Sequence, residues 1–273
     1  MSNSDLPAGR LPAPAAELPE LMRAILARTP ARVLVGRAGP AYRTATQLEL
    51  RRDHAAAVDA VHAGLDPVKD LGRAFVKRWQ LFEVCTRAGT RTEYLMRPDL
   101  GRRLDDAARG EVAGACTPGA DLQVVIGDGL SATAVAVQVP AVLPFLEQGA
   151  RQRGWGFGRP FLVRYCRVGV LNDVGELLDP RVAVLLIGER PGLATAESLS
   201  AYMAYRPRPG HTDAQRNLIS NIHARGVAPE AAAWRILALA EKMRQLQTSG
   251  VAVKEDLPPL LSPGAPARPG AAN

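Results

Sequence analysis

Two uninterrupted apolar runs mark the middle of the chain. They cover Val124–Ile126 and Val182–Ile187 and consist of β-branched residues, leucine and one alanine. Strands of this composition are typically buried on both faces, as in a mostly parallel sheet covered by helices. A third strand is expected within Pro160–Val170, written PFLVRYCRVGV. The pattern therefore predicts an α/β fold with a Rossmann-like, mostly parallel sheet and helical cover.

Apolar residues at helical spacing predict helices on both sides of these strands. The expected helices are Leu18–Arg28, Thr46–Ala63, one around Asp105–Ala115, one capped by Ser131 and ending near Arg153, Asn172–Leu178 and Ala228–Ser249. Glycine, proline and arginine predict loops at Val35–Thr44 and Thr92–Leu104. The sheet is thus expected to follow a helical N-terminal region.

Composition divides the chain into four expected segments. Residues 1–20 and 254–273 are rich in Pro, Ala and Gly, cannot build a core and are expected to be flexible tails. Residues 21–115 are expected to form the mainly helical N-terminal region, and residues 116–253 the α/β domain. No internal repeat is visible.

The composition is that of an ordinary globular protein: 47% of the 273 residues are hydrophobic and 22% are charged. No apolar run approaches the roughly 20 residues that span a bilayer, and the N-terminus lacks the apolar core of a signal peptide. We therefore expect a cytoplasmic protein. Cys85, Cys116 and Cys166 are widely spaced, which predicts reduced thiols and neither a disulfide framework nor a zinc site.

The net charge of +7 raises the question of nucleic-acid binding. The excess arginine is scattered in pairs such as Arg51–Arg52 and Arg102–Arg103, aromatic residues make up only 5% of the chain, and no nucleic-acid-binding module is visible. We expect no nucleic-acid partner. An acidic protein partner fits the charge equally well.

Polar, glycine-containing loops follow three of the expected strands. They contain the segments GDGLS, CRVG and GERPG, at residues 127–131, 166–169 and 188–192. In open α/β sheets, ligands lie at the carboxyl ends of the strands. This places Glu189 and Arg190 where a ligand or partner would bind. The alternative is that the two residues only neutralise each other in solvent, where an ion pair contributes little.

Other candidate chemistry is weaker. The turn at Asp128–Ser131 could hold an anion at a helix N-terminus, or could be only a cap and a turn. Neither a dinucleotide fingerprint, a P-loop nor a nucleophile elbow is present, and the histidines lack metal-ligand spacing. Ser220–His223 is expected to be a polar group in a loop after Arg216. The sequence therefore assigns no catalytic residue and no metal ligand to this chain.

Several separated motifs nevertheless resemble a known family in order and in detail. They are VGRAGPAYRT with LRRDHAAAVDAV, then EYLMRPDLGRRL, VVIGDGLSATAV, PFLVRYCRVG, LLIGERPGLATAESLSAY and LISNIHARG. Together they resemble the small (light) subunit of ethanolamine ammonia-lyase, from about Ala31 to Val253. The motifs are long and irregular, so they are specific to the family.

The resemblance implies an adenosylcobalamin-dependent lyase that converts ethanolamine to acetaldehyde and ammonia. It implies that a large subunit, a β/α barrel, carries the radical chemistry, and that the small subunit covers the cobalamin at the interface of the two chains. The implied cofactor contacts fall on Val168, Glu189 and Leu218. Family members have cysteine in place of Leu218, so only a backbone contact is expected there.

The sequence also lacks the D-x-H-x-x-G pattern with which some cobalamin domains supply a histidine to cobalt. Cobalt is therefore expected to take no ligand from this chain. The resemblance leaves open whether the complex is enclosed in a bacterial microcompartment.

Two functions from other classes compete with this one. The chain could be a non-catalytic scaffold or targeting module whose N-terminal tail docks into a protein shell. It could also be a self-contained α/β enzyme that uses Asp128 and Glu189 as acid and base.

Overall fold

The computed structural model describes residues 20–28, 36–191 and 195–256. The two expected tails lie almost entirely outside these residues. Within the described part, a six-stranded sheet forms the centre of the molecule, with strand order β3-β5-β4-β6-β7-β8. The strands are β3 (Glu83–Cys85), β4 (Leu122–Gly127), β5 (Phe161–Arg164), β6 (Val182–Gly188), β7 (Leu199–Tyr205) and β8 (Asn217–Ile222).

The four strands from β3 to β6 are parallel, whereas β7 and β8 are each antiparallel to their neighbour. The prediction of an α/β protein with a mostly parallel sheet is therefore confirmed. The antiparallel edge was not predicted, and the finer Rossmann-like assignment stays an expectation.

The order in which the chain adds strands to the sheet reverses at β4. It runs from β4 to β5 on one side and then returns to β6 on the other side of β4. A crevice opens at the carboxyl ends of the strands at such a switch point. The loops after β4 and β6 therefore flank the position where ligands bind in sheets of this kind.

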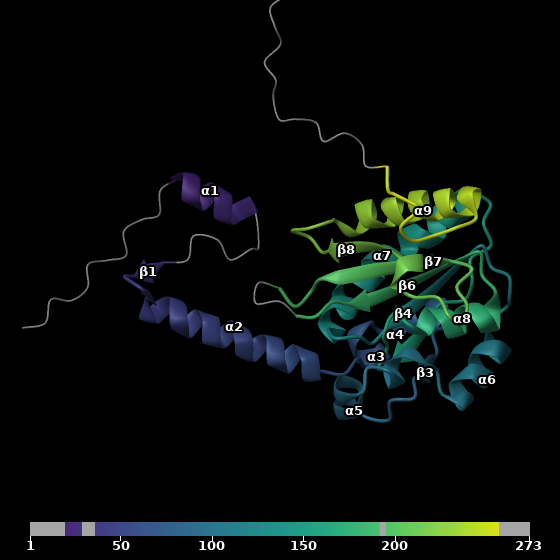
Figure 1. Cartoon of the computed structure of the whole chain (residues 1–273), viewed down its shortest axis with the longest axis horizontal. Helices are drawn as coiled ribbons and strands as arrows, with labels where there is room; N and C mark the ends of the chain where they lie inside the picture. The colour runs from purple at the N-terminus through teal and green to yellow at the C-terminus, as the bar shows by residue number, and fades with distance from the viewer. Residues whose placement is uncertain (1–19, 29–35, 192–194, 257–273) are drawn as a thin grey trace, which may run out of the picture.

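Helices cover both faces of the sheet (Figure 1). One face packs against α7 (Ala132–Gln152) and α9 (Pro229–Leu246), and the other against α6 (Asp106–Ala115) and α8 (Val170–Leu178). The alternation of side chains along β6 decides which core each residue joins: Leu186 faces the α7–α9 layer, and Leu185 faces the α6–α8 layer. The two helical layers explain why every residue of β4 and β6 is buried.

The cover is incomplete over β7 and β8 on the α8 side. Ala201 and Ile219 are buried on the α9 side, whereas Tyr202 is half-buried and Leu218 is 46% exposed on the opposite face. Tyr202 lies opposite Leu218 across the two strands. This open part of the sheet leaves room for a pocket.

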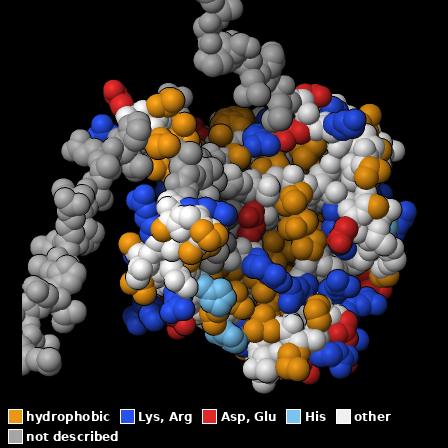
Figure 2. All heavy atoms as spheres, turned by 60° about the vertical axis from the view of Figure 1, so that its left-hand side comes forward, with side chains coloured by type: hydrophobic (Ala, Val, Ile, Leu, Met, Phe, Trp, Pro, Cys, Tyr) orange, Lys and Arg blue, Asp and Glu red, His pale blue; other side chains and the backbone are white. Residues whose placement is uncertain are grey.

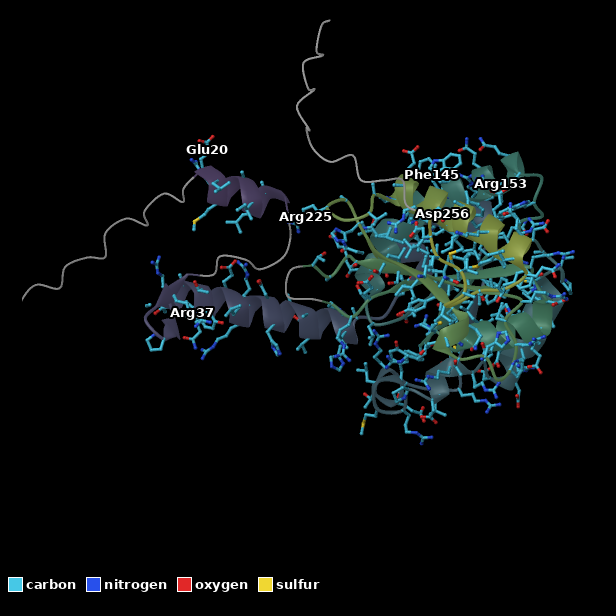
Figure 3. All side chains as sticks on the ribbon, turned by 45° about the horizontal axis from the view of Figure 1, so that its top comes forward. Glu20, Arg37, Phe145, Arg153, Arg225 and Asp256 are labelled. Carbon is cyan, nitrogen blue, oxygen red and sulfur yellow. The ribbon has the colours of Figure 1, made fainter. Side chains whose placement is uncertain are left out.

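An N-terminal arm projects from the body (Figure 1). We define it as residues 20–28 and 36–62, which contain α1 (Glu20–Arg28), the short strands β1 (Arg37–Ala38) and β2 (Ala41–Tyr42), and α2 (Thr44–His62). Along α2, the one buried residue is Ala60, and Leu48 is 60% exposed. Figure 3 shows Glu20 and Arg37 on this arm, far from Phe145 of α7 and from Arg153, which directly follows that helix.

The prediction of a loop over Thr92–Leu104 was wrong in part. The segment begins in α5 (Arg91–Met96), and a 3-10 turn covers Leu100–Arg102. The Thr90 side chain caps α5 by accepting from the Glu93 backbone N–H, and the buried Tyr94 holds the helix against the body. Two further short helices, α3 (Pro67–Asp70) and α4 (Arg73–Trp79), were not predicted.

The expected loop at Ser220–His223 was also wrong. Ser220 to Ile222 belong to β8, because Ile219 and Ile222 are buried and hold the strand against the core. The remaining predicted helices are present, with ends that differ by up to three residues from those expected.

Candidate functional site

The three residues implied as cofactor contacts lie on one side of the sheet. Val168 is in the loop between β5 and α8, Glu189 directly follows β6, and Leu218 is the second residue of β8. Val168 and Leu218 line the same pocket, with a volume of about 690 Å³. We call it the basic pocket, because four of its lining residues are arginines: Arg102, Arg103, Arg167 and Arg216.

Glu189 lies outside the lining of the basic pocket but shares its face of the sheet. Leu185, Ile187 and Glu189 alternate onto the same side of the chain. Leu185 lies opposite Tyr202, and Tyr202 opposite Leu218. The carboxylate is therefore at the carboxyl end of the strands, and the pocket lies further along the same face.

The backbone and side chain of Glu189 are both fixed by neighbouring strands. Its backbone N–H donates to Ser198 O at 3.0 Å. Its Oε1 accepts from Ser200 Oγ at 2.7 Å and from the Asn221 N–H at 2.9 Å. No ion pair joins Glu189 to Arg190 in the described residues, so the alternative of a solvent-exposed pair between them is wrong. Both hydrogen bonds use Oε1, which leaves the lone pairs of Oε2 for a donor on a ligand.

The turn after β8 holds Asn221 in place. Asn221 has a positive φ of 62°, and its side-chain Oδ1 lies 2.7 Å from His223 Nε2. His223 is buried, and its Nδ1 accepts from the Arg225 N–H. Figure 3 shows Arg225 at the end of the body that faces the arm. The polar group predicted from the sequence thus shapes the turn that supplies a donor to Glu189.

Val168 is held by a rigid connection around Tyr94. The Tyr94 hydroxyl donates to Cys166 O at 3.1 Å, and the Arg167 guanidinium lies 4.2 Å from the centre of the Tyr94 ring. The Arg167 N–H also donates to Gly101 O at 2.7 Å. These contacts fix Cys166 and Arg167, the two residues before Val168, and the apolar side chain of Val168 lines the pocket.

The GDGLS turn acts as a cap. Ser131 Oγ accepts from the Ala134 N–H at 3.0 Å, which confirms the predicted cap of the following helix. The Leu130 N–H donates to Gly188 O, and a Cβ on Gly129 would lie 2.4 Å from Ile187 Cγ1. The turn is therefore packed against the end of β6. Of the two interpretations of this segment, the structure favours a helix cap with a tight turn over an open site for an anion.

Asp128 is fully buried beneath this turn. Its Oδ1 lies 3.3 Å from Arg91 Nη1, while Oδ2 has no hydrogen-bond partner in the described structure. Burial raises the pKa of the Asp128 carboxyl to about 6, and the Arg91 guanidinium opposes this shift. Asp128 and Glu189 share none of the described pockets. Neither carboxylate lines one of these pockets, so no described pocket brings the two together as an acid–base pair.

The arm meets the body at a second cleft, of about 420 Å³. His54 and His62 of α2 line one side of it, and Leu130, Arg190 and Pro191 line the other. The two histidines thus lie at the junction of arm and body. Figure 2, which brings this end of the molecule forward, shows hydrophobic side chains gathered in the middle of the face, between groups of Lys and Arg side chains.

Among the described residues, no three or more His, Cys, Asp and Glu side chains lie together in a way that could hold a metal ion. None of the helices in this part of the chain has the length and hydrophobicity of a membrane span. The scaffold alternative depends on the N-terminal tail, which is outside the described residues.

The basic pocket was missed by the sequence analysis, which treated its arginines as scattered charge. Arg102 and Arg103 lie between β3 and β4, Arg167 follows β5, and Arg216 directly precedes β8. The only available signal was that Arg102 and Arg103, Arg167, and the segment after Arg216 lie in or beside three of the family motifs.

Comparison with known proteins supports the resemblance over nearly the same span. The family model described as Ethanolamine ammonia-lyase light chain (EutC) matches residues 19–254. The ethanolamine ammonia-lyase small subunit of Rhodopseudomonas palustris (strain BisA53) is 43% identical over 228 residues, which cover 84% of this chain and 87% of that protein.

Two further relatives carry the same name. The protein of Clostridium perfringens (strain ATCC 13124) is 41% identical over 84% of this chain and 75% of its own length. That of Listeria innocua serovar 6a is 42% identical over 83% of this chain and 75% of its own length. The chain therefore belongs to the ethanolamine ammonia-lyase light chain family, the small subunits of that lyase.

Proposed function

We propose that this small subunit helps to bind and enclose adenosylcobalamin at its interface with the catalytic large subunit of ethanolamine ammonia-lyase. The complex would convert ethanolamine to acetaldehyde and ammonia. The large subunit would hold the amino alcohol, and this chain would contact the cofactor through Val168, Glu189 and the backbone of Leu218.

One observation carries this proposal: Val168, Glu189 and Leu218, which are far apart in the sequence, share one open face of the sheet. That face suits the chemistry of a cobalamin, which combines an apolar corrin ring with amide groups at its edge. Val168 offers apolar contact, and Oε2 of Glu189 can accept from an amide N–H. Arg216 Nε and His211 Nδ1 are buried donors without a partner in the described structure, and they suit amide carbonyls.

When bound, adenosylcobalamin supplies a carbon-centred radical by homolysis of its cobalt–carbon bond. The residues of this chain would bind and orient, since the reacting radical must be kept from water and from misplaced groups.

The N-terminal arm is the proposed contact with the large subunit. It exposes the apolar side chains of Leu48 and Val58 together with four arginines, Arg37, Arg43, Arg51 and Arg52. Arginine is favoured at protein interfaces for its planar and weakly hydrated guanidinium. The arm ends at the cleft beside Glu189 and Arg190, so binding there would bring the large subunit over the open face of the sheet. We expect the complex in the cytoplasm, with or without a microcompartment.

Reconstitution tests the proposal. We expect no ammonia release from ethanolamine when the purified small subunit is supplied with adenosylcobalamin alone, and release when the large subunit is added. The large subunit alone should bind adenosylcobalamin more weakly than the assembled complex does. Ammonia release by the small subunit alone, or equal cofactor affinity with and without it, would contradict the proposal.

A further inference from the structure

The arginines of the basic pocket carry more positive charge than their neighbours neutralise. Arg103 pairs with the buried Asp173 at 2.8 Å, and Arg216 pairs with the exposed Asp213. Arg102 and Arg167 have no ion-pair partner among the described residues. The pocket therefore presents net positive charge to whatever fills it.

Buried donors in the same pocket lack acceptors. The side chain of Arg216 is only 6% exposed, and its Nε has no hydrogen-bond partner in the described structure. Arg167 Nε is also buried without a hydrogen-bond partner in the described structure. A buried donor without a partner destabilises the fold, so an acceptor that enters the pocket and pairs with it recovers that free energy.

His211 adds a neutral donor. Burial, followed by the neighbouring Arg208 and Arg216, lowers the pKa of His211, so the imidazole is uncharged at neutral pH. Its Nε2 accepts from Arg208, which assigns the proton to Nδ1, and this atom is also buried without a partner in the described residues. The pocket thus offers a neutral N–H donor beside its guanidinium groups.

Two glycines allow the loops that carry Arg102 and Arg167 to pack closely. A Cβ on Gly101 would lie 2.8 Å from Arg167 Cγ and 2.9 Å from Tyr165 O. A Cβ on Gly169 would lie 2.7 Å from Arg102 Cβ. Gly169 is also the N-cap of α8 and provides no side-chain cap, so the positive end of the helix dipole lies at the pocket. These contacts bring the two unpaired guanidinium groups to one pocket.

We propose that the basic pocket holds the phosphodiester group of the nucleotide loop of adenosylcobalamin. Arg102 and Arg167 would balance its charge, and Arg216 Nε would donate to it. Guanidinium groups suit phosphate oxygens, because they give charge-assisted hydrogen bonds in a planar fork. This inference rests on the proposed function, and it names the part of the cofactor that the arginines would bind.

A pair of ligands tests the assignment in the assembled complex of both subunits. Adenosylcobinamide keeps the corrin ring and the adenosyl group but lacks the nucleotide loop and its phosphodiester. We expect Arg102→Gln and Arg167→Gln each to raise the Kd for adenosylcobalamin about tenfold and to change the Kd for adenosylcobinamide less than about twofold. Arg151→Gln, an exposed arginine on α7 in the opposite helix layer, is the matched control and should change neither Kd. Thermal unfolding of each variant checks that the fold is intact.

The outcomes separate this inference from the proposed function. If Glu189→Ala weakens both ligands while Arg102→Gln and Arg167→Gln weaken both equally or neither, the phosphodiester assignment is overturned and the proposed function stands. If Glu189→Ala changes neither Kd, the proposed function fails instead.

A free anion has the same chemistry as the phosphodiester, so inorganic phosphate is titrated into the same complexes. Phosphate that competes with adenosylcobalamin but not with adenosylcobinamide supports the assignment. Arg102→Gln could instead abolish phosphate binding without selectively weakening the affinity for adenosylcobalamin. That result would assign the pocket to a free anion and overturn the phosphodiester assignment.

Discussion

The N-terminal arm and the α/β body place their apolar residues in opposite environments. α2 has 19 residues, of which Ala60 alone is buried, whereas α7 has 21 residues, of which ten are buried. The apolar face of α7 stabilises the fold of its own chain. Leu48 and Val58 of α2 are 60% and 43% exposed, so they are available for a contact with another molecule. The buried face of α7 therefore holds this chain's own fold together, whereas α2 is the helix that we propose contacts the large subunit.

Arg91 connects the two regions. Its Nε donates to Val61 O near the end of α2 at 2.8 Å, and its Nη1 lies 3.3 Å from Asp128 Oδ1 at the end of β4. Its guanidinium also lies 5.0 Å from the centre of the Tyr94 ring. The arm is therefore attached to the same end of the sheet as the candidate site, which couples assembly to cofactor binding in our proposal.

The largest effect is expected from removing the arm. We expect deletion of Gly36–Ala63 to abolish co-purification with the large subunit, because it removes the exposed apolar residues and the four arginines. Deletion of residues 1–19, which lack core-forming sequence, should leave the complex intact. A stable complex after the first deletion would show that the arm does not hold the partner.

Next in size is a packing change that the body should not tolerate. A Cβ on Gly175 of α8 would lie 1.7 Å from Pro207 O, and the backbone there cannot move aside easily. We expect Gly175→Ala to lower the free energy of unfolding by about 3 kcal/mol. Gly64→Ala, directly after the arm, meets no atom within 4 Å and should change it by less than about 1 kcal/mol. Equal denaturation midpoints for the two variants would show that the body tolerates a Cβ at Gly175 as well as the chain does at Gly64.

A pH-dependent effect of intermediate size is expected at Asp128. Its pKa in the folded chain, about 6, lies above the ordinary value of 3.8. The folded state therefore binds the proton more tightly, so this carboxyl stabilises the fold at low pH and the contribution is lost as pH rises through about 6.

We expect Asp128→Asn to remove this dependence. The free energy of unfolding of the variant, relative to the unsubstituted chain, should rise by about 2 kcal/mol from about pH 4.5 to about pH 7.5. The ion pair with Arg91 forms only when the carboxyl is ionised, so its effect is already contained in the pKa of about 6. A constant difference across the pH range would show that the carboxyl is not perturbed.

The smallest effect is expected at the connection between the regions. Arg91→Lys keeps a positive charge beside Asp128 but cannot maintain the two separate donors to Val61 O and Asp128. Loss of one such hydrogen bond costs about 0.5–1.5 kcal/mol, so we expect affinity for the large subunit to fall roughly three- to tenfold. Surface plasmon resonance measures the affinity of each variant for the large subunit. Unchanged affinity with unchanged stability would show that arm and body are not coupled through Arg91.

Much of the body could be predicted because its signals are local. The apolar runs of β4 and β6 and the Ser131 cap each depend on a few consecutive residues. The antiparallel strand β7, written LSAYMAY, mixes serine, alanine and tyrosine, so its position between β6 and β8 was not visible. Pairing with β6 across its whole length, rather than its own composition, defines it.

The site could be predicted only in outline. The rule that ligands lie at strand ends placed Glu189, but its contacts with Ser200 and Asn221 depend on strands paired through the sheet. The basic pocket unites Arg102, Arg167 and Arg216 from three separate loops. No local pattern joins residues so far apart, and the resemblance pointed to their neighbours rather than to them.

Cofactor titration of Glu189 variants decides whether this face binds adenosylcobalamin. Without the carboxylate, a donor on the cofactor loses its acceptor at an enclosed interface, which costs about 1–3 kcal/mol. We expect Glu189→Ala to raise the Kd of the assembled complex for adenosylcobalamin roughly ten- to hundredfold, and Glu189→Gln, which keeps a carbonyl acceptor, to raise it less. The affinity for the amino alcohol should change much less, and Glu176→Ala, a half-exposed glutamate on α8, serves as control. Equal affinities of the Glu189→Ala and unsubstituted complexes, with both complexes intact, would contradict the account.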